Sequence, residues 1–368
     1  MNIAVIFPYN NIFSKERTKP VVLAGLPYIT NSTHHITVIS RFTNTPIKYH
    51  NILLTPQNTN KQQYYNEVLK LANSIPLDLI EVHQDLLLAV FIAKKTHKKV
   101  SLIKHGAYLV NNFKEKFLLY RKFIEFMYLK YIHSVYCISN HVCSELKKKY
   151  NNYHKKFLTV YNTYGHIKAT QLNKSYKKGN IICYAGKPTT YKGFFQILPA
   201  LNKVLKTHPK YKVIFMLSFF NNNIKQQCEV DKLLKNMFYQ QILSKKLEIY
   251  YNLANKDVFT ILQKSKILLV PTITKEPFGL IALEGYLAGC IVISTAEGGL
   301  KEIAEESGIY FNNIKKTNQN YNTISAVINS YNILLPQINK TLKSVSHKFN
   351  PITNTKLLDN HRSLSKKE

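Results

Sequence analysis

The sequence alternates short apolar runs with longer segments of helical periodicity, and this alternation restricts the possible fold more than any other feature. Strands are predicted at residues 3–7, 36–40, 79–82, 100–103, 135–138, 158–161, 181–185, 213–217, 247–250, 267–270 and 291–294. Helices are predicted between them, at residues 62–72, 86–95, 114–131, 141–149, 193–207, 228–234, 256–264 and 278–288. Strands that alternate with helices are typical of the α/β class with parallel, doubly wound sheets.

The alternation is interrupted once, in the polar stretch at residues 162–176, which we interpret as a linker. This interruption predicts an N-terminal Rossmann-like domain at 1–165, a C-terminal one at 166–345, and a helical tail at 346–368 that can pack back on the first domain. Two such domains in series would face each other with the carboxyl ends of their sheets, where ligands bind in open α/β folds.

The composition is that of a chain with two hydrophobic cores. The 368 residues are 45% hydrophobic, and no run approaches the roughly 18 apolar residues of a membrane span. The N-terminus lacks the basic and apolar regions of a signal peptide, and the five scattered cysteines include no C-x-x-C pair. These features predict a cytoplasmic protein.

The net charge of +31 is extreme and has two interpretations. Residues 1–165 carry 22 Lys/Arg against 8 Asp/Glu, a charge of +14, and the remaining 29 against 12 give +17, so the excess is spread along the chain. Abundant Asn, Ile and Tyr suggest a compositional bias. The alternative is attraction to an anionic partner, such as a membrane surface, lipid-linked phosphates or nucleic acid.

One segment carries the clearest functional signal. Glu276 follows the predicted strand at 267–270, a helix is expected to begin at Pro277 and to end before Gly289, and Glu284 is expected two turns into that helix. The backbone N–H groups and the positive dipole end of a helix start suit an anion such as a diphosphate. The two carboxylates can accept hydrogen bonds from sugar hydroxyls. The segment therefore predicts a nucleotide-sugar site.

The same segment resembles the E-x7-E element of the retaining GT-B glycosyltransferases of family 4, the glycosyl transferases group 1. The resemblance continues through residues 287–289, 292–293 and 298–303. It extends to residues 184–187 with Lys192-Gly193, to Lys104-His105-Gly106, and more weakly to 137–139 and 160–162. It implies the GT-B fold, in which two Rossmann-like domains face each other across a cleft.

The resemblance also implies roles for individual residues. Lys187 and Lys192 would grip the donor diphosphate and replace the metal ion of other transferases. Glu276 would contact the transferred sugar, Glu284 the ribose, and His105 would approach the sugar from the first domain. The loop and helix start would complete the donor site with four residues: Gly186, Phe278, Gly279 and Leu280. No metal and no cofactor is implied, and no Asp-x-Asp signature occurs.

The implied function is transfer of a hexose, with retention, from a nucleoside diphosphate sugar to a hydroxyl of a glycan or glycolipid. UDP-sugar is the favoured donor and envelope polysaccharide or lipopolysaccharide assembly the favoured pathway, on the cytoplasmic side and in peripheral contact with the inner face of the membrane. Two alternatives stay open. One is another GT-B activity such as a nucleotide-sugar epimerase, and the other is a degenerate-fold basic protein that binds membrane or nucleic acid.

Several features have two interpretations. The glycine-free loop at 8–20 carries Arg17 and Lys19, which either contact an acceptor phosphate or are solvated loop charges. The basic, aromatic stretch at 113–132 is either a helix that lies on an anionic bilayer or a domain helix with one buried stripe. Gly298-Gly299 either forms a tight turn or approaches a phosphate. The twelve histidines other than His105 are assigned no role.

Overall fold

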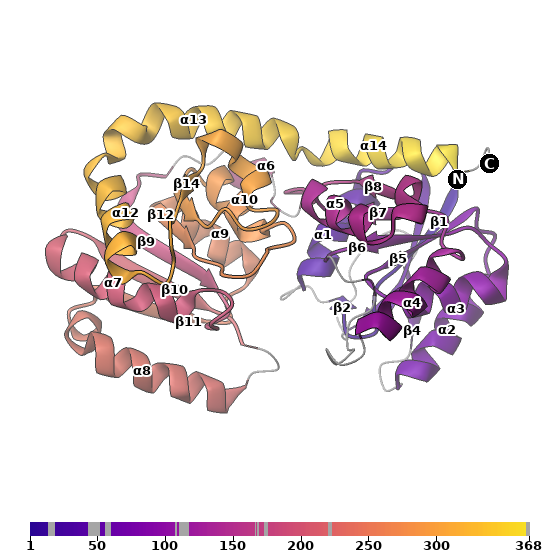
Figure 1. Ribbon diagram of the computed structural model, residues 1–368, viewed down its shortest axis with the longest axis horizontal. Helices are drawn as coiled ribbons and strands as arrows, with labels where there is room; N and C mark the ends of the chain where they lie inside the picture. The colour runs from indigo at the N-terminus through magenta and orange to yellow at the C-terminus, as the bar shows by residue number, and fades with distance from the viewer. Residues whose placement is uncertain are drawn as a thin grey trace. The chain divides into compact units, whose positions relative to one another are not determined.

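The computed structural model describes residues 1–13, 19–42, 52–55, 60–106, 109, 118–165, 167, 169–172, 176–219 and 223–365. The chain divides into two compact units (Figure 1). The first unit comprises Met1–His166 together with Phe349–Glu368, and the second comprises Ile167–Lys348.

The first unit is built on a parallel sheet, which has eight strands among the described residues. Its order is β2-β3-β1-β5-β6-β7-β8, with β4 also paired to β3. The strands are β1 (Asn2–Ile6), β2 (Ile12–Phe13), β3 (His35–Phe42), β4 (Ile52–Thr55), β5 (Leu79–His83), β6 (Val100–Lys104), β7 (Val135–Cys137) and β8 (Phe157–Thr159).

Helices connect most of these strands, as parallel pairing requires, and α14 from the C-terminal segment joins the same unit. They are α1 (Pro20–Thr30), α2 (Lys61–Asn73), α3 (Leu86–Thr96), α4 (Leu118–Leu129), α5 (Asn140–Lys149), the 3-10 helix η2 (Asn151–Lys156) and α14 (Pro351–Leu364). The strands β5 and β6 are buried along their whole length, which explains why they read as continuous apolar runs in the sequence.

The second unit repeats this architecture on a six-stranded parallel sheet in the order β11-β10-β9-β12-β13-β14. The strands are β9 (Gly179–Gly186), β10 (Lys212–Leu217), β11 (Leu247–Tyr251), β12 (Ser265–Val270), β13 (Ile291–Ser294) and β14 (Ile309–Tyr310). The helices are α6 (Ala169–Leu172), α7 (Phe194–Thr207), α8 (Ile224–Leu243), α9 (Asn255–Lys264), α10 (Leu280–Leu287), α11 (Lys301–Ala304), η4 (Glu305–Ser307), α12 (Thr317–Asn329) and α13 (Tyr331–Lys348).

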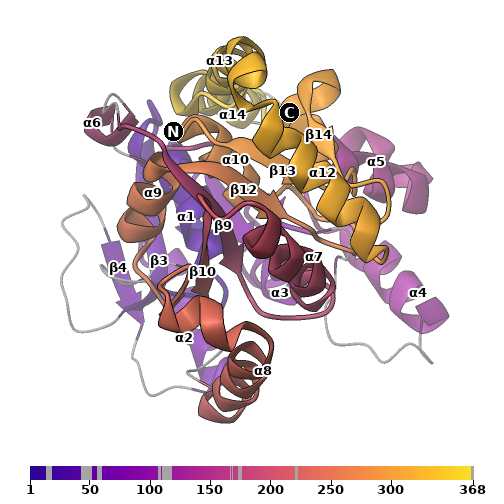
Figure 2. The same cartoon turned by 90° about the vertical axis from the view of Figure 1, so that its left-hand side faces the viewer.

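Side chains alternate between the two faces of the second sheet, and both faces are covered. On one face Ile267 and Leu269 of β12 share a core with apolar residues of α7, α8 and α12. Figure 2 shows α7 between α12 and α8. On the other face α10 approaches closely, because a Cβ at Gly285 would lie 2.4 Å from Leu268 Cδ2. The predicted α/β class with two doubly wound sheets is confirmed.

Among the elements that differ from the sequence-based expectation are α1, α8 and the tail helix. The helix α1 was not predicted because Gly25 and Pro27 lower its helical propensity. Burial of its apolar side chains in the first unit stabilises it instead. The helix α8 is longer than expected because Asn223 caps its start, accepting from the Gln226 N–H at 3.1 Å. The predicted tail helix begins only at Pro351, where the side chain of Asn350 caps it.

The helix α14 is held to the first unit by a buried ionic cluster. Both Arg362 and Glu81 have fully buried side chains, and the guanidinium binds Glu81 through Nε (2.9 Å) and Nη2 (2.6 Å). Its Nη1 binds Asp359 at 2.7 Å, and Asp359 in turn accepts from the N–H of Thr33 at 2.8 Å. The C-terminal segment is thereby tied to β5 and to the turn after α1.

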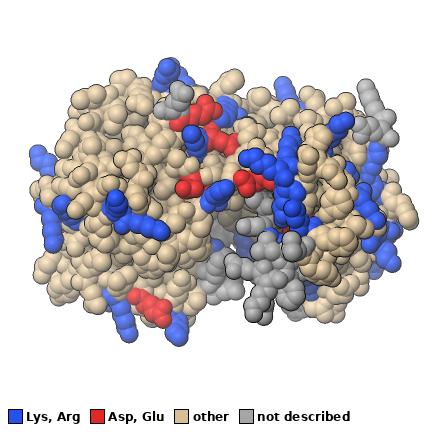
Figure 3. All heavy atoms as spheres, in the orientation of Figure 1, with Lys and Arg blue, Asp and Glu red and all other residues tan. Residues whose placement is uncertain are grey.

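Lysine and arginine side chains are spread over the visible face of the molecule, and acidic side chains occur in few places (Figure 3). This distribution agrees with the even spread of charge along the sequence. Across the described ranges, no helix is both long enough and apolar enough to pass through a bilayer.

The helix α4 has one buried and one exposed face. Its inner face carries Glu125, fully buried, which accepts from Lys149 Nζ at 2.7 Å. Its outer face exposes Tyr120, Phe123 and Met127, spaced at three and four residues. One buried stripe and one exposed apolar stripe therefore lie on this helix.

Candidate functional site

The topological switch point of the second unit lies between β9 and β12, because β10 continues the sheet from β9 in one direction and β12 continues it in the other. Open α/β sheets bind ligands at this position, outside the carboxyl ends of the strands. The loop at 187–193 follows β9 and the loop at 271–279 follows β12. A backbone hydrogen bond from Ile273 N to the Tyr191 carbonyl (2.9 Å) joins the two loops.

The two loops bring together residues that the sequence predicted separately. Lys192 Nζ donates a hydrogen bond to Glu276 Oε2, and both side chains keep partial exposure, 30% and 18%. Lys187 is half-buried in the same loop as Lys192, and Gly186 ends β9 directly before it. A cation and an anion with solvent access thus share the switch point, as a site for a charged, hydroxylated ligand requires.

Two helices begin at this edge without a side-chain cap. Gly193 precedes α7 and Gly279 precedes α10, and both have left-handed backbones with no side-chain cap among the described residues. A Cβ at Gly193 would lie 1.7 Å from the carbonyl oxygen of Pro271, so only glycine allows the two loops to approach this closely. The helix starts therefore offer positive dipole ends beside Lys192.

The helix α10 begins later than the sequence predicted. It starts at Leu280, not at Pro277, because Gly279 has a φ of 100° and cannot belong to the helix. Glu284 consequently lies in the second turn of α10 and is half-buried. The ring of Phe278 is buried, which anchors the loop and leaves its backbone, rather than its side chain, to face a ligand.

The glycine pair after β13 supports the Glu276 loop. Gly299 N–H donates to the Glu276 carbonyl at 2.7 Å, and Glu276 and Gly298 form a parallel β-bridge. Gly298 has a φ of 65°, and a Cβ there would lie 2.4 Å from the Glu276 carbonyl oxygen. The pair thus makes a tight turn whose backbone packs directly against the loop that carries Glu276.

Replacing Gly298 with alanine is expected to destabilise the second unit by at least about 1–2 kcal/mol, because the left-handed backbone is strained for alanine and the new methyl group overlaps Glu276. Chemical denaturation followed by far-UV circular dichroism measures the change. Gly106→Ala is the control, since a Cβ there meets nothing within 4 Å. Equal stability of the two variants would contradict the prediction.

In the first unit, His105 follows β6 at the carboxyl edge of the sheet. Its N–H donates to Gln84 Oε1 (2.9 Å), and its Nε2 lies 3.0 Å from Nδ1 of His83 at the end of β5. Burial and the neighbouring ammonium of Lys104 lower the pKa of His105 to about 3. His105 is therefore a neutral imidazole at physiological pH.

Lys104 is itself unusual, because its side chain is fully buried. Its ammonium lies 3.4 Å from the carbonyl oxygens of Gln84 and Leu109, and burial lowers its pKa to about 7. The lysine thus links the turn after β5 to the segment that follows His105. Arg17 lies outside the described residues, and Lys19 donates to the Asn10 carbonyl within its own loop.

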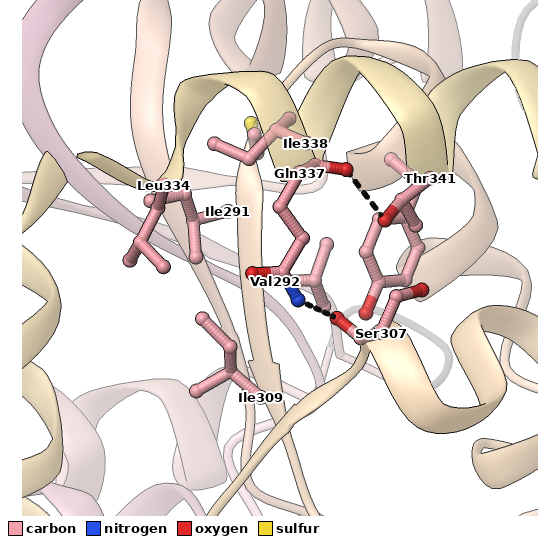
Figure 4. Close-up of a pocket in the computed structure, with 10 residues that line it drawn as sticks. Ile291, Val292, Ser307, Ile309, Leu334, Gln337, Ile338 and Thr341 are labelled. Atoms are coloured by element: carbon pink, nitrogen blue, oxygen red, sulfur yellow. Dashed lines mark hydrogen bonds between the residues drawn. The ribbon is translucent and has the colours of Figure 1, made fainter. Parts of the chain in front are cut away.

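An apolar pocket lies elsewhere in the second unit and does not match the predicted chemistry. It is enclosed between α13 and the strands β13 and β14, with Ile291, Leu334 and Ile338 on its wall (Figure 4). The amide of Gln337 crosses it to donate to the Ser307 carbonyl at 3.2 Å. Its lining contains no charged side chain, so it does not suit a diphosphate.

Residues 168–331, nearly the whole second unit, match the family model of the glycosyl transferases group 1. The matched segment is similar to the glycosyl transferases group 1 and spans somewhat less than half of the chain. A curated relative, an uncharacterized glycosyltransferase of Methanocaldococcus jannaschii, is 30% identical over 132 residues. That alignment covers 35% of this chain and 31% of the relative, so it spans about a third of each protein.

Solved structures extend the similarity of fold to both units. Anabaena HepE, crystallised with UDP, is 14% identical with a TM-score of 0.73 and covers 99% of this chain and 100% of its own. Sucrose-phosphate synthase of Thermosynechococcus elongatus is 15% identical with a TM-score of 0.76 over 99% of this chain and 98% of its own. The two Rossmann-like units in series are those of the GT-B fold.

Some contacts at these sites were not predicted from the sequence. The phenol of Tyr184 donates to the Lys187 carbonyl at 2.7 Å, and burial raises the pKa of Tyr184 well above its usual range. In the first unit His83 and Gln84 contact His105, although the sequence assigned His83 no role. The sequence offered a signal in the positions of these residues. His83 and Gln84 directly follow the predicted strand at 79–82, and His105 lies just after the predicted strand at 100–103.

Proposed function

We propose that the protein is a retaining glycosyltransferase that moves a hexose from a nucleoside diphosphate sugar to a hydroxyl of a glycan or glycolipid. The observation that carries the proposal is the pairing of Lys192 with Glu276 beside two uncapped helix starts at the switch point of the group 1 unit. Lysines and helix dipoles suit a diphosphate, and the carboxylate suits sugar hydroxyls.

In this proposal the protein supplies charge and position. Lys187 and Lys192 neutralise the departing nucleoside diphosphate, so that a metal ion is not required. Glu276 binds the hydroxyls of the transferred sugar, and Glu284 binds the ribose. The acceptor hydroxyl attacks on the face from which the diphosphate leaves, and its proton passes to the leaving phosphate. His105, as a neutral imidazole, approaches the transferred sugar from the first domain.

UDP is the proposed nucleotide. Support comes from the shared fold of Anabaena HepE, which has been crystallised with UDP, with UDP and glucose, and with UDP-glucose. The proposed acceptors belong to envelope polysaccharide or lipopolysaccharide assembly, and the proposed place of transfer is the cytoplasmic side of the membrane.

Calorimetric titration with UDP, GDP and ADP tests the donor site. Micromolar binding of one nucleotide to the wild-type protein is expected, with loss of binding in Lys187→Ala/Lys192→Ala. Glu284→Ala should weaken binding by about tenfold or more, because a charge-assisted hydrogen bond to the ribose is lost.

The control for the double lysine variant is Lys203→Ala/Lys206→Ala, which removes the same charge from the exposed face of α7. If no nucleotide binds, the transferase proposal is wrong and a degenerate binding protein on the same fold is favoured. If sugar isomers form from the donor without acceptor, the protein is an epimerase.

We further propose that α4 contacts an anionic membrane surface. Tyr120 and Phe123 on its outer face are 59% and 62% exposed, and Lys122 and Lys130 flank them. The acidic residue of this helix, Glu125, is buried against Lys149 and does not oppose an anionic surface. Aromatic side chains beside lysines suit the interface of a bilayer that carries negative charge.

Sedimentation with phosphatidylcholine vesicles, with and without phosphatidylglycerol, tests this contact. Binding is expected only with the anionic lipid and should weaken as salt is added. The double variant Tyr120→Ser/Phe123→Ser should bind at least about fivefold more weakly, because apolar area no longer enters the interface. Tyr239→Ser, which removes an exposed aromatic from α8, is the control. Unchanged binding of the double variant would refute the role of α4.

A further inference from the structure

The pair His83–His105 is the least expected arrangement of titratable groups in the first unit. The ring centroids lie 5.3 Å apart, and the interplanar angle is 28°. Their hydrogen bond joins Nδ1 of His83 to Nε2 of His105 at 3.0 Å. Only one of the two nitrogens can carry the proton of this bond, so each ring restricts the tautomer of the other.

His83 is held more firmly than His105. It is 1% exposed, its ring lies 4.5 Å from that of Phe7, and α1 closes over it at Gly25. A Cβ at Gly25 would lie 2.8 Å from His83 Cε1, which shows how little space surrounds the ring. His105, by contrast, is half-buried at the edge of the sheet. The buried ring is therefore the fixed member of the pair and the accessible ring is the one it orients.

Both rings are neutral at physiological pH. Burial, together with His105 and the guanidinium of Arg362, lowers the pKa of His83 well below its usual value, and His105 is affected in the same direction. Two neutral imidazoles can share one proton without the repulsion that two imidazolium ions would suffer. Within the described residues, the ring of His105 has no hydrogen bond other than the one to His83.

We propose that His83 is a positioning residue that occupies Nε2 of His105 and so leaves Nδ1 of His105 to bind a hydroxyl of the transferred sugar. This inference rests on the proposed transferase function. Nδ1 of His105 is the atom that binds the hydroxyl, and His83 is the residue that leaves this atom available. Without His83 the imidazole of His105 is free to change tautomer and rotate, and the productive orientation is only one of several.

The test compares two substitutions of His83 with the same substitutions at an exposed histidine. His83→Leu introduces an apolar side chain of similar size and removes the hydrogen bond, whereas His83→Asn keeps a polar atom near the position of Nδ1. Turnover is expected to fall by about tenfold to a hundredfold in His83→Leu, with the donor KM little changed, and to recover largely in His83→Asn. His154→Leu and His154→Asn are the controls.

The second measurement is the nitrogen-15 NMR spectrum of the imidazoles, which reports the tautomer directly and does not depend on activity. The wild-type protein should show a single neutral tautomer for His105, and His83→Leu should show a mixture. An unchanged His105 spectrum or unchanged turnover in folded His83→Leu would overturn the proposal, as would His83→Asn being as slow as His83→Leu. If the protein transfers no sugar, the spectrum still decides the role of His83, and nucleotide binding decides the function separately.

Discussion

Replacing Arg362 with alanine is expected to destabilise the first unit by about 3–5 kcal/mol, because it leaves the buried carboxylate of Glu81 without its cation. Arg362 donates two hydrogen bonds to Glu81, and both side chains are fully excluded from solvent. A lone carboxylate in that position must either stay charged without a partner or take up a proton, and both outcomes favour unfolding.

Chemical denaturation and amide hydrogen exchange by mass spectrometry measure this effect. Exchange should accelerate in peptides from β5 and α14 and stay unchanged in peptides from the second unit, since the cluster lies within the first. Lys212→Ala is the control, because its pair with Glu248 is 36% and 28% exposed. An exposed pair contributes about 0–1 kcal/mol. Equal losses of stability in the two variants would contradict the prediction.

Replacing Lys192 with alanine is expected to lower turnover by about a hundredfold to a thousandfold, the usual effect of removing one group that stabilises a developing negative charge. Lys192 is bound to Glu276, so a donor diphosphate that binds Lys192 competes with this carboxylate. Glu276→Gln should therefore bind the nucleoside diphosphate at least as tightly as the wild type. Its turnover should fall, because the hydroxyls of the sugar lose a charged hydrogen-bond acceptor.

Steady-state kinetics with the nucleotide-sugar that binding identifies, combined with titration of the free diphosphate, separate these effects. Lys206→Ala removes an exposed lysine from the last turn of α7 and should retain full turnover. The interpretation fails if Lys192→Ala is as fast as this control. It also fails if Glu276→Gln loses affinity for the diphosphate, because the ion pair would then be supporting the site and not competing with it.

The sequence predicted the parts of the protein whose signals are local. The segment from β12 through α10 to β13 was predicted as one βαβ unit, because buried strands leave continuous apolar runs and Gly289 ends the helix. The alternation of such runs was sufficient to predict two doubly wound sheets. Helix α1 escaped prediction because its glycine and proline contradict helical propensity, and only burial in the first unit compensates for them.

The tertiary structure decided which of the predicted residues meet. Lys192 and Glu276 are 84 residues apart and come together because β9 and β12 are neighbours at the switch point, a pairing that depends on strand order and not on any local pattern. Arg362 reaches Glu81 across 281 residues, and His83 reaches His105 because β5 pairs with β6. The sequence by itself determined the elements that have local signals and the chemical types of the site residues. The strand order determined their partners, because side chains far apart in the chain meet only when the sheet brings their strand ends to one edge.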